Sequence, residues 1–135
     1  MSDLIFIDAN VFLAYDNIND ANHKNGLKIW EEVEAGRYGD YFTSDYVFNE
    51  VVGVTFRKKG KERTVLLGEH ILKSVLMINI DDHLLRWAWK IFSTTKLSLN
   101  LVDCTNLAAM EIAGAEYIAT LDREFTQIKS IEVVS

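Results

Sequence analysis

The sequence predicts an α/β domain of three layers, in which a mainly parallel sheet of about five strands lies between helices. Three observations predict it. Short apolar runs alternate with longer segments of helical periodicity along the chain. The first apolar run is continuous, as is typical of parallel strands buried on both faces. The 135 residues carry no low-complexity or Gly/Ser-rich linker, so we expect one domain over residues 1–135.

The first half of the chain contains two strand candidates, residues 4–7 and 41–44. The run at 4–7 is wholly apolar and ends at Asp8. The helix candidates of this half carry apolar side chains at helical spacing and end near glycine or basic residues. They cover residues 23–34, 63–73 and the segment from Asp45, the expected N-cap, to the basic run 57–63.

The second half repeats the alternation of strands and helices. Residues 75–80, 117–120 and 131–134 are strand candidates, because each is a short run rich in apolar and β-branched side chains. A helix opens at residues 81–83, where acidic side chains suit a helix start. Another helix covers 104–113, with Gly114 as its expected C-cap.

Composition limits the classes of function. Cys104 is the only cysteine, which excludes an internal disulfide and a cysteine-based zinc cluster and fits a reducing compartment. The first residues lack a basic segment before an apolar stretch, and no apolar run approaches the roughly 18 residues of a membrane helix. We therefore expect a cytoplasmic protein with no membrane partner. The net charge of −6 argues against tight nonspecific binding of nucleic acid.

Acidic residues stand at or near the expected carboxyl ends of strands, where open parallel sheets bind their ligands. Asp8 closes the first strand, Asp103 follows the apolar pair Leu101 and Val102, and Asp122 comes two residues after the strand that ends at Thr120. Glu50 lies just over one turn into the helix that begins at Asp45 and borders its apolar stripe.

Each acid has two interpretations. Asp8, Asp103 and Asp122 are suitable helix or turn caps, and Glu50 is suitable for a solvated helix face. Four carboxylates that converge, however, repel each other by about 4 kcal/mol per pair at about 4 Å and an effective dielectric constant of about 20. A hard divalent cation such as Mg²⁺ or Mn²⁺ relieves that repulsion and takes oxygen ligands.

Four segments resemble the motifs of PIN-domain nucleases, and in particular the VapC-like toxin of type II toxin–antitoxin pairs. The segments are FIDANVFLAY at 6–15, TSDYVFNEVV at 43–52, LVDCTNLAAM at 101–110 and YIATLDREF at 117–125. In that family each motif contributes one acid to a metal site, and the resemblance places these acids at Asp8, Glu50, Asp103 and Asp122. Asn10 stands where the family usually has a hydroxyl.

The resemblance implies a metal-dependent endoribonuclease, in which Mg²⁺ or Mn²⁺ activates water for hydrolysis of an RNA phosphodiester. The four acids would be both metal ligands and catalytic residues, and Asn10, Thr120 and Arg123 are implied as substrate contacts. The family also implies an antitoxin partner and a homodimer. Trp87 and Trp89 cannot share one face of a helix, so one of them is a candidate for contact with a partner.

The main alternative keeps the PIN-like fold and drops catalysis, which leaves a module that binds RNA or a protein partner. Four mutually repelling acids argue against it, because a site without metal has no need of them. A phosphoryl-accepting receiver domain fits less well, since it needs an acidic pair at the end of the first strand and Asp8 is followed by Ala9. A haloacid-dehalogenase-type phosphatase needs an aspartate where Asn10 stands.

Overall fold

The computed structural model describes residues 3–135, so the first two residues of the predicted domain lie outside it. Its sheet has five strands, all parallel, in the order β3-β2-β1-β4-β5. The strands are β1 (Leu4–Ile7), β2 (Asp40–Ser44), β3 (Leu76–Ile78), β4 (Tyr117–Ala119) and β5 (Glu132–Val134). All five predicted strands are therefore present, with ends that differ by at most two residues.

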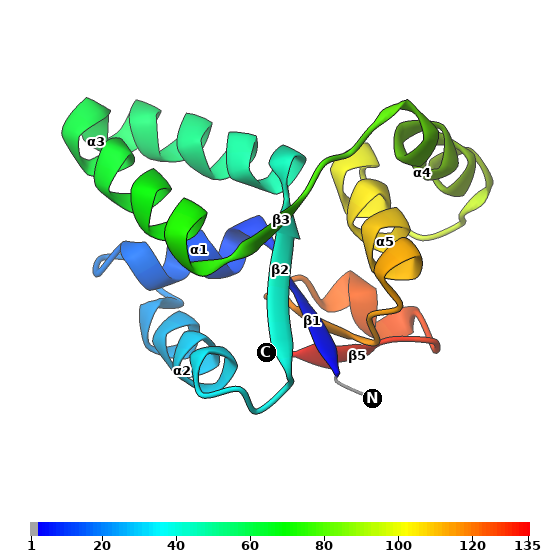
Figure 1. Cartoon of the computed structure of the whole chain (residues 1–135), viewed down its shortest axis with the longest axis horizontal. Coiled ribbons are helices and arrows are strands. Elements are labelled where there is room, and N and C mark those ends of the chain that lie inside the picture. Colours follow the sequence, from blue (N-terminus) through cyan, green and yellow to red (C-terminus); the bar gives the residue numbers. More distant parts are fainter. Residues whose placement is uncertain (1–2) are drawn as a thin grey trace.

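Helices cover both faces of this sheet, which confirms the predicted α/β architecture. They are α1 (Ala9–Asp16), α2 (His23–Glu34), α3 (Asp45–Ser74), α4 (Asp82–Thr94) and α5 (Leu101–Ala113), with a short 3₁₀ helix η1 (Arg123–Gln127) before β5. Figure 1 shows α1, α2 and α3 on one side of the sheet and α4 and α5 on the other. None of the helices formed by residues 3–135 has the length and apolar character that a membrane crossing needs.

The strand order creates a switch point between β1 and β4. The chain first moves outward from β1 to β2 and β3, and it then returns to the other side of β1 for β4 and β5. Connections that leave neighbouring strands in opposite directions open a crevice at the carboxyl ends of those strands. The Asp8 amide donates to the Ala119 carbonyl at 3.0 Å, so the residues that follow β1 and β4 meet there.

Helix α3 bends sharply at Gly60, whose φ of 83° lies in the left-handed region that favours glycine. Its two arms correspond to the two helices predicted on either side of the basic run, and Figure 1 shows them folding back on each other. The basic run is helical up to this bend and beyond it, and its Arg57, Lys58 and Lys59 are exposed.

The N-cap of α3 differs from the prediction. Ser44 is the N-cap, because its hydroxyl accepts from the Val47 amide at 3.2 Å. Asp45 is the first helical residue, and its carboxylate accepts instead from the Ile80 amide at 2.8 Å and from the Asn79 side chain at 2.9 Å. Asp45 thus ties the start of α3 to the loop after β3, a long-range partnership that local spacing does not reveal.

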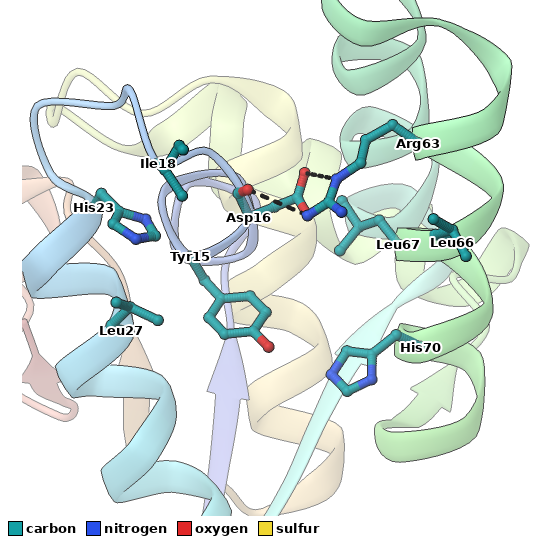
Figure 2. A pocket seen from close by; sticks show the side chains of 9 residues that line it. All are labelled: Tyr15, Asp16, Ile18, His23, Leu27, Arg63, Leu66, Leu67 and His70. Carbon is teal, nitrogen blue, oxygen red and sulfur yellow. Dashed lines mark hydrogen bonds and ion pairs between the residues drawn. The ribbon is translucent and has the colours of Figure 1, made fainter.

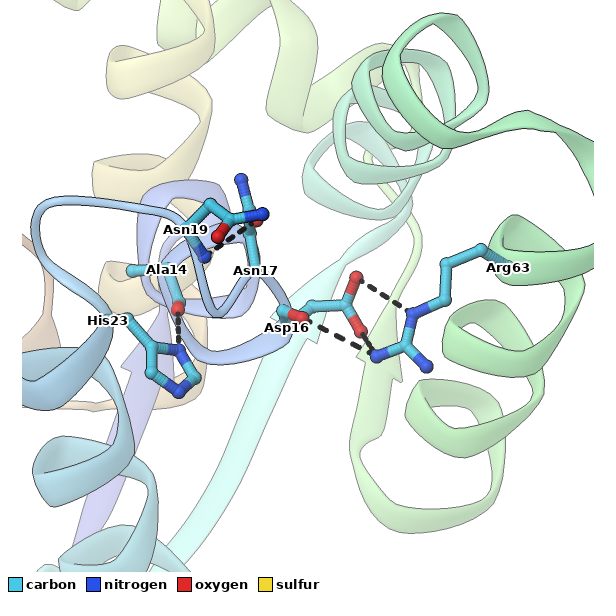
Figure 3. Close-up of polar contacts among 6 residues, drawn as sticks. All are labelled: Ala14, Asp16, Asn17, Asn19, His23 and Arg63. Atoms are coloured by element: carbon cyan, nitrogen blue, oxygen red, sulfur yellow. Dashed lines mark hydrogen bonds and ion pairs between the residues drawn. The ribbon is translucent and has the colours of Figure 1, made fainter.

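Polar contacts fix the far end of α1 against α2 and the second arm of α3. Figure 2 shows the cavity of about 430 Å³ that these elements enclose, with Tyr15, Leu27 and His70 among its walls. Figure 3 shows Arg63 of α3 paired with the buried carboxylate of Asp16, and His23 Nδ1 2.9 Å from the Ala14 carbonyl oxygen. These contacts fix the end of α1 that is opposite Asp8, its N-cap.

Gly26 permits the close approach of α2 to α1. A Cβ at this position would lie 2.9 Å from Ala14 Cβ and 2.9 Å from the Tyr15 backbone nitrogen. We expect Gly26→Ala to lower the free energy of unfolding by about 1–3 kcal/mol through overpacking. Gly53→Ala is the matched control, because a Cβ there meets only the flexible end of Arg57 at 3.5 Å, and helix propensity predicts a gain of about 0.5–1 kcal/mol. Urea denaturation measures both; equal effects would contradict the close packing.

Candidate metal centre

Asp8 is the most buried of the four acids, with 6% of its surface exposed. It is the N-cap of α1, where its Oδ1 accepts from the Ala9 amide at 2.7 Å. The same oxygen accepts from Asn106 Nδ2 at 3.2 Å, and Oδ2 accepts from the Thr120 hydroxyl at 2.8 Å. Burial raises the pKa of Asp8, and these three hydrogen bonds offset part of the rise because they favour the charged carboxylate.

Thr120 joins Asp8 to the loop after β4. Its side chain is fully buried, and its oxygen accepts from the Asp122 amide at 3.1 Å and from Asn10 Nδ2 at 3.3 Å. The Asn10 side chain reaches the same loop with its oxygen, which accepts from the Leu121 amide at 3.0 Å. Thr120 and Asn10, both expected near the site, therefore hold the loops after β1 and β4 together.

Asp103 lies in the first turn of α5 and forms a capping box with Asn100. Its Oδ2 accepts from the Asn100 amide at 3.0 Å, and its own amide donates to Asn100 Oδ1 at 2.8 Å. Leu101 and Val102 are already helical, so the expectation that α5 begins only at Cys104 was wrong. The N-cap at Asn100 starts the helix three residues earlier, and Asp103 does take part in capping it.

The pKa of Asp103 rises to about 6. Burial is the main cause, and the negative charges of the other three acids add to it, whereas the hydrogen bond from the Asn100 backbone acts in the opposite direction. The three acids are Asp8, Asp122 and Glu50. Asp103 therefore lies within electrostatic reach of the other three carboxyl groups that the sequence singled out.

Glu50 projects from the first arm of α3 and Asp122 precedes η1. Glu50 is exposed as a residue, but partial burial of its carboxyl group and the charge of Asp8 raise its pKa. Asp122 is half-buried and is the N-cap of η1, with Oδ1 accepting from the Glu124 amide at 2.9 Å. Its predicted capping role is confirmed.

The donor set consists of carboxylate oxygens, which suits Mg²⁺ or Mn²⁺. As the side chains stand, no three Asp, Glu, His or Cys residues between positions 3 and 135 form a ready set of metal ligands. Asp8 and Asp103 instead direct oxygens at N–H and O–H donors of the protein. The four carboxyl groups thus fit such an ion in two respects. They offer the oxygen ligands that it prefers, and its positive charge would relieve the repulsion among them.

The model of the family described as PIN domain matches residues 5–131. The chain belongs to the PIN domain family. All four acids and their hydrogen-bond partners lie inside the matched region.

A ribosomal RNA endonuclease is similar to this PIN domain over almost its whole length. The chain is 24% identical over 133 residues to the 23S rRNA-specific endonuclease VapC20 of Mycobacterium tuberculosis, a match that covers 96% of this chain and 98% of VapC20. The crystal structure of VapC20, described as a Sarcin-Ricin loop cleaving toxin, has a TM-score of 0.80 at 23% identity and covers 91% of this chain and 93% of that one.

Two further solved structures share the fold as well. VapBC2 of Rickettsia felis, bound to a DNA fragment from its promoter, has a TM-score of 0.72 at 13% identity, with 97% of each chain covered. FitAcB of Neisseria gonorrhoeae has a TM-score of 0.69 at 14% identity and covers 97% of this chain and 96% of that one. These similarities confirm the PIN-like fold of the chain.

The site contains one residue that sequence reasoning missed, Asn106. Its side chain is fully buried and donates to Asp8, while its Oδ1 is buried and accepts no hydrogen bond within residues 3–135. The available signal was an asparagine directly before a run of apolar side chains in α5. Because a buried amide needs a polar partner, such a residue indicates a polar contact in the core.

Cys104 and the tryptophans lie outside this group of acids. Cys104 is fully buried, and burial and the charge of Asp103 raise the pKa of its thiol. Trp30 lies in the core, whereas Trp87 and Trp89 are 38% and 57% exposed. Both belong to α4 and are therefore available at the surface.

Asp103 makes the stability of the metal-free PIN domain depend on pH. Because its pKa is about 6 in the folded state against an ordinary 3.8, the folded state binds a proton that the unfolded chain has already lost between these values. Its contribution therefore favours folding below about pH 4 and is lost as the pH rises through about 6. We expect Asp103→Asn, in EDTA, to be more stable than the parent at pH 7 and to lose that advantage at pH 4.

Urea denaturation at the two pH values measures this difference. The asparagine keeps an oxygen that can accept from the Asn100 amide, so the comparison isolates charge from capping. A variant less stable than the parent at pH 7 would show that the cap, and not repulsion, dominates at Asp103.

Proposed function

We propose that this PIN domain is a metal-dependent endoribonuclease that hydrolyses RNA phosphodiester bonds and is the toxin of a toxin–antitoxin pair. The convergence of Asp8, Glu50, Asp103 and Asp122 at the carboxyl ends of β1 and β4 carries the proposal, since their charges act on one another. The similarity to VapC20, named a 23S rRNA-specific endonuclease, supports RNA as the substrate class.

Mg²⁺ or Mn²⁺ would be held by Asp8, Glu50, Asp103 and Asp122. When bound, such an ion polarises a phosphate and lowers the pKa of an attacking water. The chain orients the Asp8 carboxylate for this role through donors from α1, from α5 and from the loop after β4. Asp103 would contribute carboxylate lone pairs that its hydrogen bond from the Asn100 amide leaves free.

The three predicted substrate contacts divide into two roles. The Thr120 hydroxyl donates to Asp8 and Asn10 is bonded to the loop after β4, so we assign both to positioning. Arg123 is exposed beside Asp122, and its guanidinium forms no ion pair with any described residue. We assign Arg123 to the RNA phosphate, because a free guanidinium pairs strongly with phosphate oxygens.

The alternative is a non-catalytic PIN-like module that binds RNA or a protein. The absence of a ready ligand set among residues 3–135 favours it, as does the capping role of three of the four acids. Capping, however, does not account for Glu50, which lies in the second turn of α3 and whose pKa is raised by partial burial and by the charge of Asp8. The nuclease accounts for all four acids and is our conclusion.

The proposed partners are an antitoxin and a second copy of the chain. The antitoxin follows from similarity to VapBC2 and FitAcB, and a cytoplasmic location from the single free cysteine. The homodimer is supported by aromatic side chains that α4 leaves exposed. Trp89 and Phe92 lie with ring centroids 5.6 Å apart, and exposed aromatic clusters mark interaction surfaces.

Metal-dependent cleavage is the first test of the nuclease. We expect the purified protein to cut a mixture of tRNA and ribosomal RNA in Mg²⁺ or Mn²⁺, to stop in EDTA, and to lose at least about 100-fold in rate with Asp8→Asn or Asp103→Asn, because each removes a negative charge from the proposed site. Asp40→Asn, an exposed acid at the opposite end of β2, is the control. Gel electrophoresis of the RNA measures the rate.

Cleavage that persists in EDTA or in both variants would refute the metal mechanism. If no RNA is cut under any metal and no metal raises the melting temperature, the binding module replaces the nuclease.

Self-association tests the exposed face of α4. We expect Trp89→Asp to shift the protein from dimer to monomer, because a charge cannot be buried unpaired in a contact between copies. Phe56→Asp is the control, since Phe56 is also a large aromatic residue and is 50% exposed but belongs to α3. Light scattering after size-exclusion chromatography measures the mass, and a parent protein that is already monomeric would contradict the dimer.

A further inference from the structure

A small polar cavity adjoins the candidate metal centre. Its volume is about 190 Å³, less than the roughly 300–1,000 Å³ typical of pockets for whole small-molecule ligands. It lies between the start of α2 and the loop from β4 into η1, and its walls include Asn22, Asn25, Leu121, Asp122, Arg123 and Thr126. This size suits a fragment of a substrate, such as one planar base, better than a whole folded ligand.

The side-chain amides of this cavity have no partner in the described part of the chain. Asn22 precedes α2 but makes no side-chain capping bond, and neither its side-chain amide nor that of Asn25 forms a hydrogen bond with any residue between 3 and 135. The two positions are three apart, so they lie on the same side of the helix start. Both residues are exposed, so their amides are open to the donors and acceptors of a ligand at this cavity.

Thr126 and Arg123 complete the polar lining. The Thr126 hydroxyl donates to the Arg123 carbonyl at 2.6 Å, and its oxygen can still accept. Arg123 provides one positive charge, with a planar group that stacks on bases as well as pairing with phosphate. Leu121 and Val133 supply apolar contact surface in the same cavity.

This lining suits a nucleobase better than a phosphate. A phosphate only accepts hydrogen bonds and favours several N–H donors or cations, whereas the cavity combines one cation with the acid Asp122. A base edge carries donors and acceptors in alternation, and asparagine pairs with such an edge through two hydrogen bonds. Unpaired bases of RNA are commonly read in this way, with stacking against arginine or apolar side chains.

The cavity and the candidate metal centre share residues. Asp122 is one of the four acids and Thr120, which also lines the cavity, donates to Asp8. A base held between Asn22 and Asn25 would therefore lie next to the phosphate that the acids process, with Arg123 at the rim for the RNA backbone.

We propose that the cavity between the start of α2 and η1 is a base-recognition subsite, in which Asn22 and Asn25 select one unpaired nucleotide of the RNA beside the scissile bond. This inference rests on the proposed ribonuclease function and adds the residues that determine its sequence preference. Thr126 and Arg123 support the base and its phosphate, and the catalytic acids remain those named above.

Cleavage of a short RNA pool with randomised sequence, followed by sequencing of the fragment ends, tests the subsite. We expect a base preference at one nucleotide beside the cut, and a reduction of that preference by about fivefold or more in Asn25→Ala and in Asn22→Ala, as for the loss of one bidentate pair. Preferences at other positions should persist. Asn19→Ala is the matched control, because Asn19 is an exposed asparagine of the preceding loop outside the cavity.

The outcomes separate this inference from the proposed function. Cleavage with no base preference, or with a preference that both variants retain, overturns the subsite and leaves the nuclease intact. Absence of cleavage overturns the nuclease, and titration with the four nucleoside 5′-monophosphates then decides the subsite. We expect at least one of them to shift the side-chain amide NMR signals of Asn22 and Asn25 but not of Asn19, and unmoved signals refute base binding.

Discussion

The buried carboxylate of Asp8 is the interaction on which the site depends. An unpaired charge in this position would be costly, and the fold meets that cost with donors from the first turn of α1, from α5 and from the loop after β4. Each donor comes from a different part of the chain, so satisfying one charge also joins the central strand to both layers of helices. Removing a donor would leave a buried charge incompletely paired and would loosen the junction of β1 and β4.

The negative charges of the other carboxylates repel that of Asp8. Burial and the charge of Asp8 both raise the pKa of Asp103 and of Glu50. A protein without a use for a cation gains nothing from such repulsion, whereas a metal site uses it to bind the ion. The capping bonds of Asp8, Asp103 and Asp122 are compatible with this use, because a cap fixes the position of a carboxylate and leaves lone pairs free.

Contacts elsewhere in the fold hold the helices that lie at this end of the sheet. The Asp16–Arg63 ion pair and the close packing at Gly26 hold the far end of α1 against α3 and α2. On the opposite side, Trp87 Nε1 donates to Glu111 at 2.8 Å and links α4 to α5, the helix that carries Asp103 and Asn106. Both layers therefore brace elements that bear site residues.

The sequence by itself determined the alternation of elements and the five strands, and it singled out the four acids, because apolar periodicity and turn residues act over short distances. It did not reveal Asn106, whose partner Asp8 is 98 residues away, or the bond of Asp45 to Ile80. The start of α5 was also predicted too late. The apolar pair Leu101 and Val102 resembled the end of a strand, whereas the capping box at Asn100 makes both residues helical. Only the tertiary structure decided that β4 lies beside β1, which creates the switch point, gathers the acids there and opens the polar cavity beside Asp122. Strand order depends on how distant segments pack, and no local pattern encodes that packing.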